Sequence, residues 1–235
     1  MKVYKFGGAS IKDYKSVKSL AKIIRNDNCD GMILIVSAMG KTTNSMEDLV
    51  LSYKKSFKNL KTKFELIKSY HTDIIKGLFE KNQKSVLKIV GSIFNEIDNF
   101  LKLNRENDYN FIYDQLVSYG EILSSIIISK YLNSIGLKTK WVDARSCVKT
   151  DEYYRDANVD FKKTSKSIKR KIKCKGLYVS QGFIGSNSKS FTTTLGREGS
   201  DYSAAIFAHA LNAESVTIWK DVRGVLNADP RYFNK

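Results

Sequence analysis

The sequence is poor in proline, cysteine and histidine, and these shortages exclude several classes of protein. Its 235 residues include one proline, Pro230, two histidines and three cysteines. Cys29, Cys147 and Cys174 share no metal-ligand spacing, and their odd number and wide separation favour a reducing cytosol over a disulfide scaffold. No apolar run is long enough to span a bilayer, and no signal peptide precedes the first strand-like segment. We therefore expect a cytoplasmic protein without a membrane partner.

The formal net charge is +16, which raises the question of a nucleic-acid partner. Lysines are scattered along the chain, and the one dense basic run, residues 161–175, carries Phe161, Ile168 and Ile172 at the spacing of a buried helical stripe. Abundant lysine, asparagine and isoleucine with scarce proline are typical of a bias toward AT-rich codons. We expect no nucleic-acid partner, although a positive field helps to recruit small anions.

The N-terminal part of the chain alternates between strand-like and helix-like patterns. Residues 2–6 and 32–36 have the length of strands, and the second run is apolar throughout, as in a buried parallel strand. Between them, four residues recur at the spacing of one buried helix face: Val17, Leu20, Ala21 and Ile24. Strand, helix and strand in this order predict a βαβ unit.

The rest of the chain continues this pattern around a helical insert. Residues 46–104 have a helical pattern throughout, and residues 111–132 predict a further helix. The other expected elements are strands at 138–142, 176–179 and 216–219, a hairpin over 182–196, and a helix capped by Ser200. We therefore expect an α/β fold, with a mostly parallel sheet between helices and an inserted helical lobe.

The first candidate site follows the first strand. Ligands of open α/β sheets bind at the carboxyl ends of strands, and here Lys5 precedes Gly7 and Gly8. The glycines allow backbone N–H groups to approach a phosphate, and the lysine adds positive charge. Neither the P-loop pattern nor GxGxxG is present, and two glycines alone also suit an ordinary tight turn.

Two further candidates are weaker. Hydroxyls, an amide and a glycine gather at residues 37–44, although a plain loop with a helix cap has the same composition. Gly120 and Glu121 stand within the expected helix 111–132, where a glycine costs about 1 kcal/mol relative to alanine. Gly120 therefore indicates close approach of a ligand or another backbone. A buried Glu121 would need a cationic partner, such as a substrate ammonium group, while an exposed glutamate is the alternative.

The fourth candidate, residues 192–203, is the densest polar segment between two apolar elements. The planar guanidinium of Arg197 suits a carboxylate. Gly199 and Ser200 stand where a helix N-terminus binds anions. Asp201 is placed to orient a lysine ammonium by charge-assisted hydrogen bonding.

Together, these motifs resemble those of the aspartate kinases, within the wider amino acid kinase family. Residues 5–10 are similar to the signature K-F-G-G-T-S, and residues 196–203 are similar to G-R-G-G-S-D-Y-[ST]. Residues 220–231 contain forms of [TK]-D-V-x-G-[IV] and [TA]-D-P-R, and segments 37–44 and 120–121 fall in family order. The resemblance covers the whole chain. Relatives that act on glutamate, acetylglutamate or UMP lack the K-F-G-G form.

The resemblance implies an amino acid kinase domain over residues 1–235 and the transfer of the γ-phosphate of ATP to the side-chain carboxylate of L-aspartate. This reaction is the first step of lysine, threonine and methionine biosynthesis. Because the acceptor carboxylate is ionised at neutral pH, the reaction requires positioning and charge neutralisation rather than a general base. The implied cofactor is ATP with Mg²⁺, which the nucleotide itself mainly holds.

The resemblance also implies a role for each matching residue. Lys5 would neutralise the transferring phosphoryl group, and Asp201 would hold Lys5 in place. The other residues expected to contact ATP are Gly7, Gly8, Ser10, Lys220, Asp221 and Arg231. The residues expected to contact aspartate are Ser37, Thr43, Glu121, Arg197, Gly199 and Ser200. Within this second group, Arg197 would bind the α-carboxylate and Glu121 the α-ammonium group.

The chain departs from the family pattern at several positions. Ala9 stands where threonine is usual, Glu198 where glycine is common, and Arg223 where proline is usual. Glu198 must turn outward, because a carboxylate would repel bound anions. Family members continue beyond the position of Lys235 into a helix, a last strand and ligand-sensing regulatory domains. We therefore expect a domain that is incomplete at its C-terminus, has no regulatory domain and does not respond to lysine or threonine.

This difference in length leaves alternatives open. As an alternative to a competent kinase, the chain is a truncated remnant, or one subunit of a split enzyme. In either case it would bind ligand without being a competent kinase alone. Expected partners are L-aspartate and ATP, together with either a second copy in a homodimer or a complementing C-terminal polypeptide.

Overall fold

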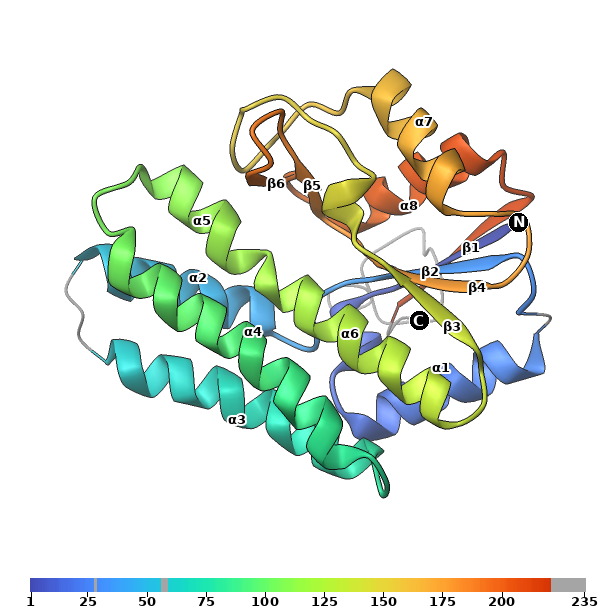
Figure 1. Cartoon of the computed structure of the whole chain (residues 1–235), viewed down its shortest axis with the longest axis horizontal. Coiled ribbons are helices and arrows are strands. Elements are labelled where there is room, and N and C mark those ends of the chain that lie inside the picture. The colour runs from blue at the N-terminus through green and yellow to red at the C-terminus, as the bar shows by residue number, and fades with distance from the viewer. Residues whose placement is uncertain (28, 56–58, 221–235) are drawn as a thin grey trace, which may run out of the picture.

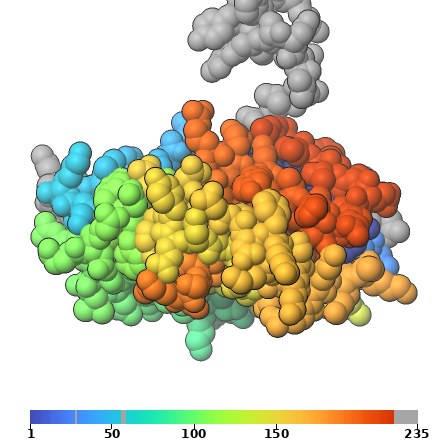
Figure 2. All heavy atoms as spheres, turned by 90° about the horizontal axis from the view of Figure 1, so that it is seen from above, coloured from blue at the N-terminus to red at the C-terminus, as the bar shows by residue number. Residues whose placement is uncertain are grey.

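The structure, a computed structural model, describes residues 1–27, 29–55 and 59–220 (Figure 1). Asp221 and Arg231, two of the predicted nucleotide contacts, lie outside the described residues. A five-stranded sheet is covered by helices on both faces, and a helical lobe lies at one end of the molecule, with α8 toward the other (Figures 1 and 2). The predicted α/β fold class is confirmed.

The main sheet has the order β3-β4-β2-β1-β7, and every neighbouring pair of its strands is parallel. Its strands are β1 (Lys2–Phe6), β2 (Met32–Val36), β3 (Thr139–Val142), β4 (Leu177–Gln181) and β7 (Ser215–Trp219). The central β2 is buried along its whole length, as its apolar sequence predicts. In the register, Lys5 pairs with Ile35 of β2 and Ile218 of β7, so the carboxyl ends of these strands lie level.

Helices fill both faces of this sheet and form the lobe. They are α1 (Tyr14–Asn26), α2 (Thr42–Lys55), α3 (Leu60–Leu78), α4 (Gln83–Leu103), α5 (Tyr109–Val117), α6 (Tyr119–Ser134), α7 (Phe161–Lys171) and α8 (Gly199–Leu211). Side chains alternate along the strands: Tyr4 and Phe6 pack with α1 and α6, while Val3 packs with α7 and α8. The predicted hairpin is also present as the antiparallel pair β5 (Ile184–Ser186) and β6 (Thr192–Thr194).

Three predictions about helices were wrong in detail. Residues 111–132 form two helices, because the chain breaks at Ser118, whose hydroxyl donates to the carbonyl of Gln115. Glu121 consequently lies in the first turn of α6 rather than in a helix interior. Ser200 does not cap α8, since Glu198 is the N-cap residue and Ser200 already belongs to the helix. In α7, Ile168 is buried as predicted, whereas Phe161 is 45 % exposed.

Candidate active site

The carboxyl ends of β1 and β2 meet the first turns of α2, α6 and α8 around a cavity of about 400 Å³. Seven of the predicted residues line it: Lys5, Ser37, Thr43, Glu121, Arg197, Gly199 and Ser200. These comprise the lysine predicted to be catalytic and all six predicted aspartate contacts, from four separate segments of the chain. A larger cavity of about 680 Å³, between α2 and α3, includes none of these seven residues.

Lys5 lies within a cluster of three charged side chains. Its Nζ atom is 2.7 Å from Oδ1 of Asp201, and Nζ of Lys220 is 3.0 Å from Oδ2 of the same carboxylate. Burial raises the pKa of Asp201, but hydrogen bonds and charge from Lys5 and Lys220 outweigh it, so the pKa lies below its usual value. Lys5 is only 5 % exposed. Asp201 therefore remains ionised and holds the buried ammonium group at the cavity wall.

Gly7 and Gly8 differ in the space available for a side chain and in whether their N–H group is already hydrogen-bonded. A Cβ atom on Gly8 would lie 2.7 Å from the carbonyl oxygen of Ala38 and 2.9 Å from that of Gly40, so only glycine fits there. The N–H of Gly7 donates to the carbonyl of Trp219 at 3.2 Å, and the Ser10 hydroxyl donates to the same carbonyl at 3.2 Å. Gly7 would therefore reach a phosphate only by giving up this bond. Gly8 begins a 3-10 helix, where N–H groups have no partner within the helix.

Glu121 is a buried carboxylate, 2 % exposed. One oxygen, Oε1, accepts from the N–H of Ala38 at 3.2 Å, and Oε2 has no hydrogen-bond partner among the described residues. Burial raises the pKa of Glu121 to about 8, against the smaller lowering effect of the Ala38 N–H. A buried oxygen without a partner is costly, so this group is suited to a cation that enters with a ligand.

The neighbouring glycine explains how Glu121 reaches its position. A Cβ atom on Gly120 would lie 2.9 Å from Cβ of Ala38 and 3.3 Å from Cγ2 of Thr42. Without a side chain, the first turn of α6 packs directly against the loop after β2. The close approach predicted for Gly120 is present, but the atoms that make it belong to side chains rather than to a ligand or another backbone.

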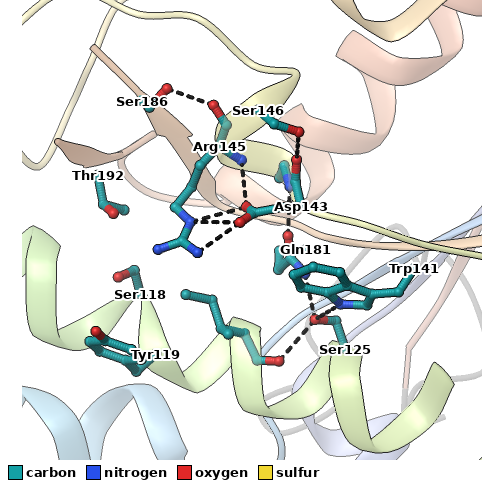
Figure 3. Close-up of polar contacts among 12 residues, drawn as sticks. Ser118, Tyr119, Ser125, Trp141, Asp143, Arg145, Ser146, Gln181, Ser186 and Thr192 are labelled. Carbon is teal, nitrogen blue, oxygen red and sulfur yellow. Dashed lines mark hydrogen bonds and ion pairs between the residues drawn. The ribbon is translucent and has the colours of Figure 1, made fainter. Parts of the chain in front are cut away.

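A hydrogen-bond network holds α6 one turn beyond Glu121 (Figure 3). The Ser125 hydroxyl accepts from Nε2 of Gln181 at 2.5 Å and from Nε1 of Trp141 at 2.9 Å, and it donates to the carbonyl of Ile122 at 3.0 Å. The side-chain oxygen of Gln181 accepts from the N–H of Ala144 at 2.7 Å. Ser125 thereby links α6 to the ends of β3 and β4, and its hydrogen-bonding capacity is fully used.

Arg197 and Glu198 follow the loop after β6, and both are exposed. No described carboxylate lies within ion-pair distance of Arg197, so its guanidinium is available to a ligand. The Glu198 side chain is 74 % exposed and its carboxylate lies 3.7 Å from Nζ of Lys220. The side chain is exposed as expected, although Glu198 still lines the rim of the cavity. Its backbone has φ 54°, in the left-handed region that favours glycine, which accounts for the glycine of the family pattern.

Six residues that line the cavity were not among the predicted contacts. Two of them, Gly196 and Glu198, belong to the predicted polar segment 192–203, and the other four are Glu47, Tyr113, Arg155 and Phe183. Glu47 stands one helical turn after Thr43, so its position on the same face of α2 was the available signal. The Tyr113 hydroxyl, from α5, donates to Glu47. No motif or periodicity marks Arg155 or Phe183, because both stand in irregular segments that only the fold brings to the site.

The described residues offer no group of three or more His, Cys, Asp or Glu side chains able to hold a metal ion. Asp201, the acidic residue next to Lys5, is already paired with two lysines. In the same ranges, no helix is both long and apolar enough to cross a membrane.

Comparison with known proteins agrees with this geometry. The family model described as "Amino acid kinase family" matches residues 1–235. Lysine-sensitive aspartokinase 3 of Escherichia coli K12 is 30 % identical over 97 % of this chain and 51 % of its own length. The chloroplastic bifunctional aspartokinase/homoserine dehydrogenase 2 of Arabidopsis thaliana is 29 % identical over 99 % of this chain and 26 % of its own.

Solved structures give the same result. Aspartokinase III of E. coli in complex with aspartate and ADP superimposes with a TM-score of 0.90 and 29 % identity, covering 98 % of this chain and 51 % of that one. The chain thus spans about half the length of that relative. The predicted resemblance to the aspartate kinases is confirmed, and the chain belongs to the amino acid kinase family.

Proposed function

We propose that this chain transfers the γ-phosphate of ATP to the side-chain carboxylate of L-aspartate, giving ADP and 4-phospho-L-aspartate. The observation that carries the proposal is that Oε2 of buried Glu121, which no described residue contacts by a hydrogen bond, lies in the same cavity as Arg197 and Lys5. An ammonium group, a carboxylate and a second anionic group are the ligand features that these three side chains complement. The likeness to an aspartokinase solved with aspartate and ADP supports the same substrates.

In this proposal, the amino acid is held by its α-carbon substituents. Glu121 accepts hydrogen bonds from the α-ammonium group, and Arg197 binds the α-carboxylate through its planar guanidinium. Ser37, Thr43 and the first turn of α8 at Gly199 and Ser200 would then bind the reacting carboxylate. This placement supplies the orientation on which phosphoryl transfer depends.

The chemical step needs charge neutralisation at the phosphorus. One oxygen of the aspartate carboxylate forms a bond to the γ-phosphorus while the bond to the β–γ bridging oxygen breaks, and ADP leaves. Lys5, held by Asp201, stabilises the charge on the transferring group. Gly8, Ser10 and Lys220 would contact the nucleotide phosphates, with Gly7 joining them if its N–H is released by Trp219. Mg²⁺, when bound with ATP, adds further positive charge.

The decisive experiment measures ADP release with L-aspartate, succinate and L-glutamate as acceptors. Succinate lacks the amino group, so it would leave Glu121 without its cation and should react at least 100-fold less efficiently. Equal use of aspartate and succinate would overturn the assignment of Glu121. A split-enzyme subunit or remnant would instead bind aspartate in calorimetry without releasing ADP.

The pathway, compartment and assembly of the protein are part of the same proposal. 4-Phospho-L-aspartate would feed lysine, threonine and methionine synthesis. A reducing compartment such as the cytosol is consistent with Cys29, Cys147 and Cys174, which are all free thiols. A homodimer and a complementing C-terminal polypeptide remain proposals for its assembly.

A further inference from the structure

Arg155 stands between two cavities. It lines the 400 Å³ cavity of the candidate active site, and it also lines an outer cavity of about 830 Å³. Among the described residues, only Gly196 and Arg197 share this double position. A ligand that passes from the outer cavity to Glu121 therefore meets two arginines, and the family motif accounts for only one of them.

The backbone of Arg155 is held in an unusual conformation. Its φ is 71°, in the left-handed region that few residues other than glycine and asparagine adopt. The N–H donates to both oxygens of Asp114, at 3.2 and 3.0 Å. Asp114 is fully buried and also accepts from the N–H of Thr194 at 2.9 Å and from its hydroxyl at 2.7 Å. Asp114 thus fixes the Arg155 backbone between α5 and β6, and strain held in this way is characteristic of functional sites.

The side chain of Arg155 is also placed by its neighbours. Its Cζ atom lies 4.3 Å from the centre of the Tyr113 ring and 5.7 Å from that of Tyr109. The Tyr113 hydroxyl donates to Glu47, which keeps the ring in place. No described carboxylate lies within ion-pair distance of the Arg155 guanidinium. Stacking leaves the edge of a guanidinium, where its N–H donors point, open to an anion.

We propose that Arg155 is a second residue that binds the α-carboxylate of the substrate, acting with Arg197; this proposal rests on the aspartate kinase activity proposed above. Two guanidinium groups can together satisfy both carboxylate oxygens, which one exposed arginine does less completely. Arg155 therefore sets the requirement for a free α-carboxylate, and it makes the site selective for acidic amino acids over their α-amides.

The test compares Arg155→Gly, Arg155→Lys and the wild type. Glycine adopts φ 71° without strain, so Arg155→Gly should keep the backbone conformation of the wild type. We expect KM for aspartate to rise about 10-fold in Arg155→Gly, the loss of one charge-assisted hydrogen bond, while kcat and KM for ATP stay within about 2-fold. Arg155→Lys, which keeps the charge without the planar fork, should lie between the two.

A second substrate tests the contact between Arg155 and the α-carboxylate separately from the rest of the site. Aspartate α-amide keeps the ammonium and the reacting carboxylate but lacks the α-carboxylate. The wild type should prefer aspartate strongly, and Arg155→Gly should reduce that preference about 10-fold, because the amide gains little from Arg155. Arg170→Ala is the matched control: it removes one arginine from the exposed surface of α7, away from both cavities, and should leave both ratios unchanged.

These measurements distinguish a failure of the Arg155 proposal from a failure of the kinase proposal. An unchanged KM for aspartate together with an unchanged preference in Arg155→Gly would overturn the role of Arg155 while leaving the kinase proposal intact. A wild type that uses neither aspartate nor its amide would overturn the proposed function itself. Equal losses for aspartate and its amide in Arg155→Gly would show a structural role instead of carboxylate recognition.

Discussion

Glu121 and Asp201 are two carboxylates beside one cavity, and they differ in the charge around them. Asp201 lies between the ammonium groups of Lys5 and Lys220, which hold its pKa below the usual range. The Glu121 carboxyl accepts from the neutral N–H of Ala38 and pairs with no described cation, and burial raises its pKa to about 8. Among the described residues, the Asp201 carboxylate therefore has its counter-charges before a ligand binds, whereas in the proposed function Glu121 would receive its counter-charge from the substrate.

The largest effect should come from Lys5→Ala, which removes the charge that Asp201 positions. We expect kcat to fall about 100-fold or more, because one preorganised group at the developing charge is lost, with a smaller change in KM for aspartate. Lys2→Ala is the matched control, since Lys2 stands on the same strand and pairs with Asp27 at 2.9 Å. Near-normal turnover by Lys5→Ala in a coupled ADP-release assay would contradict its role.

The next prediction concerns the proton on Glu121. With a pKa near 8 in the free protein, the carboxyl is mostly protonated at neutral pH and must ionise to bind an ammonium group. Aspartate binding should therefore release close to one proton at pH 6.5, and its affinity should rise with pH up to about 8. Calorimetry in buffers of different ionisation enthalpy measures this release. Glu121→Gln should abolish the release and weaken binding about 100-fold, and proton release that persisted in the variant would contradict the assignment.

The same group makes stability depend on pH. The pKa of Glu121 rises from an ordinary value of 4.5 to about 8 on folding, so the folded state binds the extra proton between these values. Unfolding free energy should consequently fall as pH rises from about 5 to 8, by an amount on the order of a few kcal/mol. Glu121→Gln should flatten this slope, as measured by urea unfolding at several pH values. An identical slope in the variant would place the titrating group elsewhere.

Asp201→Asn should lower kcat less than Lys5→Ala, because the lysine charge stays in the cavity and only its ion pair with Asp201 is lost. We expect kcat to fall about 10-fold. The lowered pKa of Asp201 means that its contribution to stability is present above an unfolded value near 3.8 and is lost as pH falls through the folded pKa. Thermal unfolding of Asp201→Asn should therefore depend less on pH below about 4. A fall in kcat as large as that of Lys5→Ala would show that Asp201 acts directly.

Residues on both sides of this comparison were predicted from the sequence: Lys5 and Asp201 form the expected ion pair, and Glu121 lines the same cavity as Lys5. The strands Lys2–Phe6 and Met32–Val36 were evident from short apolar runs, and seven of the predicted site residues line one cavity because parallel strands end at the same edge. The break at Ser118 was not predictable, since α5 and α6 are buried on most sides and their apolar pattern continues across it. Contacts such as Gln181 with Ser125 join residues 56 positions apart, and no local pattern records them.

The smallest expected effect tests whether the position of Glu121 depends on the hydrogen bonds that Ser125 makes with Gln181 and Trp141. Ser124 and Ser125 are neighbouring, fully buried residues of α6, but the Ser124 hydroxyl has no hydrogen-bond partner in the described part of the chain. Ser125→Ala would leave the donors of Gln181 and Trp141 unsatisfied and should cost about 1–3 kcal/mol, whereas Ser124→Ala should be neutral or stabilising. Because Ser125 holds α6 one turn beyond Glu121, its loss should also raise KM for aspartate about 3-fold without changing KM for ATP. Urea unfolding and steady-state kinetics of the two variants provide the measurement. Equal costs for both serines would mean that packing alone positions α6, and that the Glu121 carboxylate needs no hydrogen-bonded support.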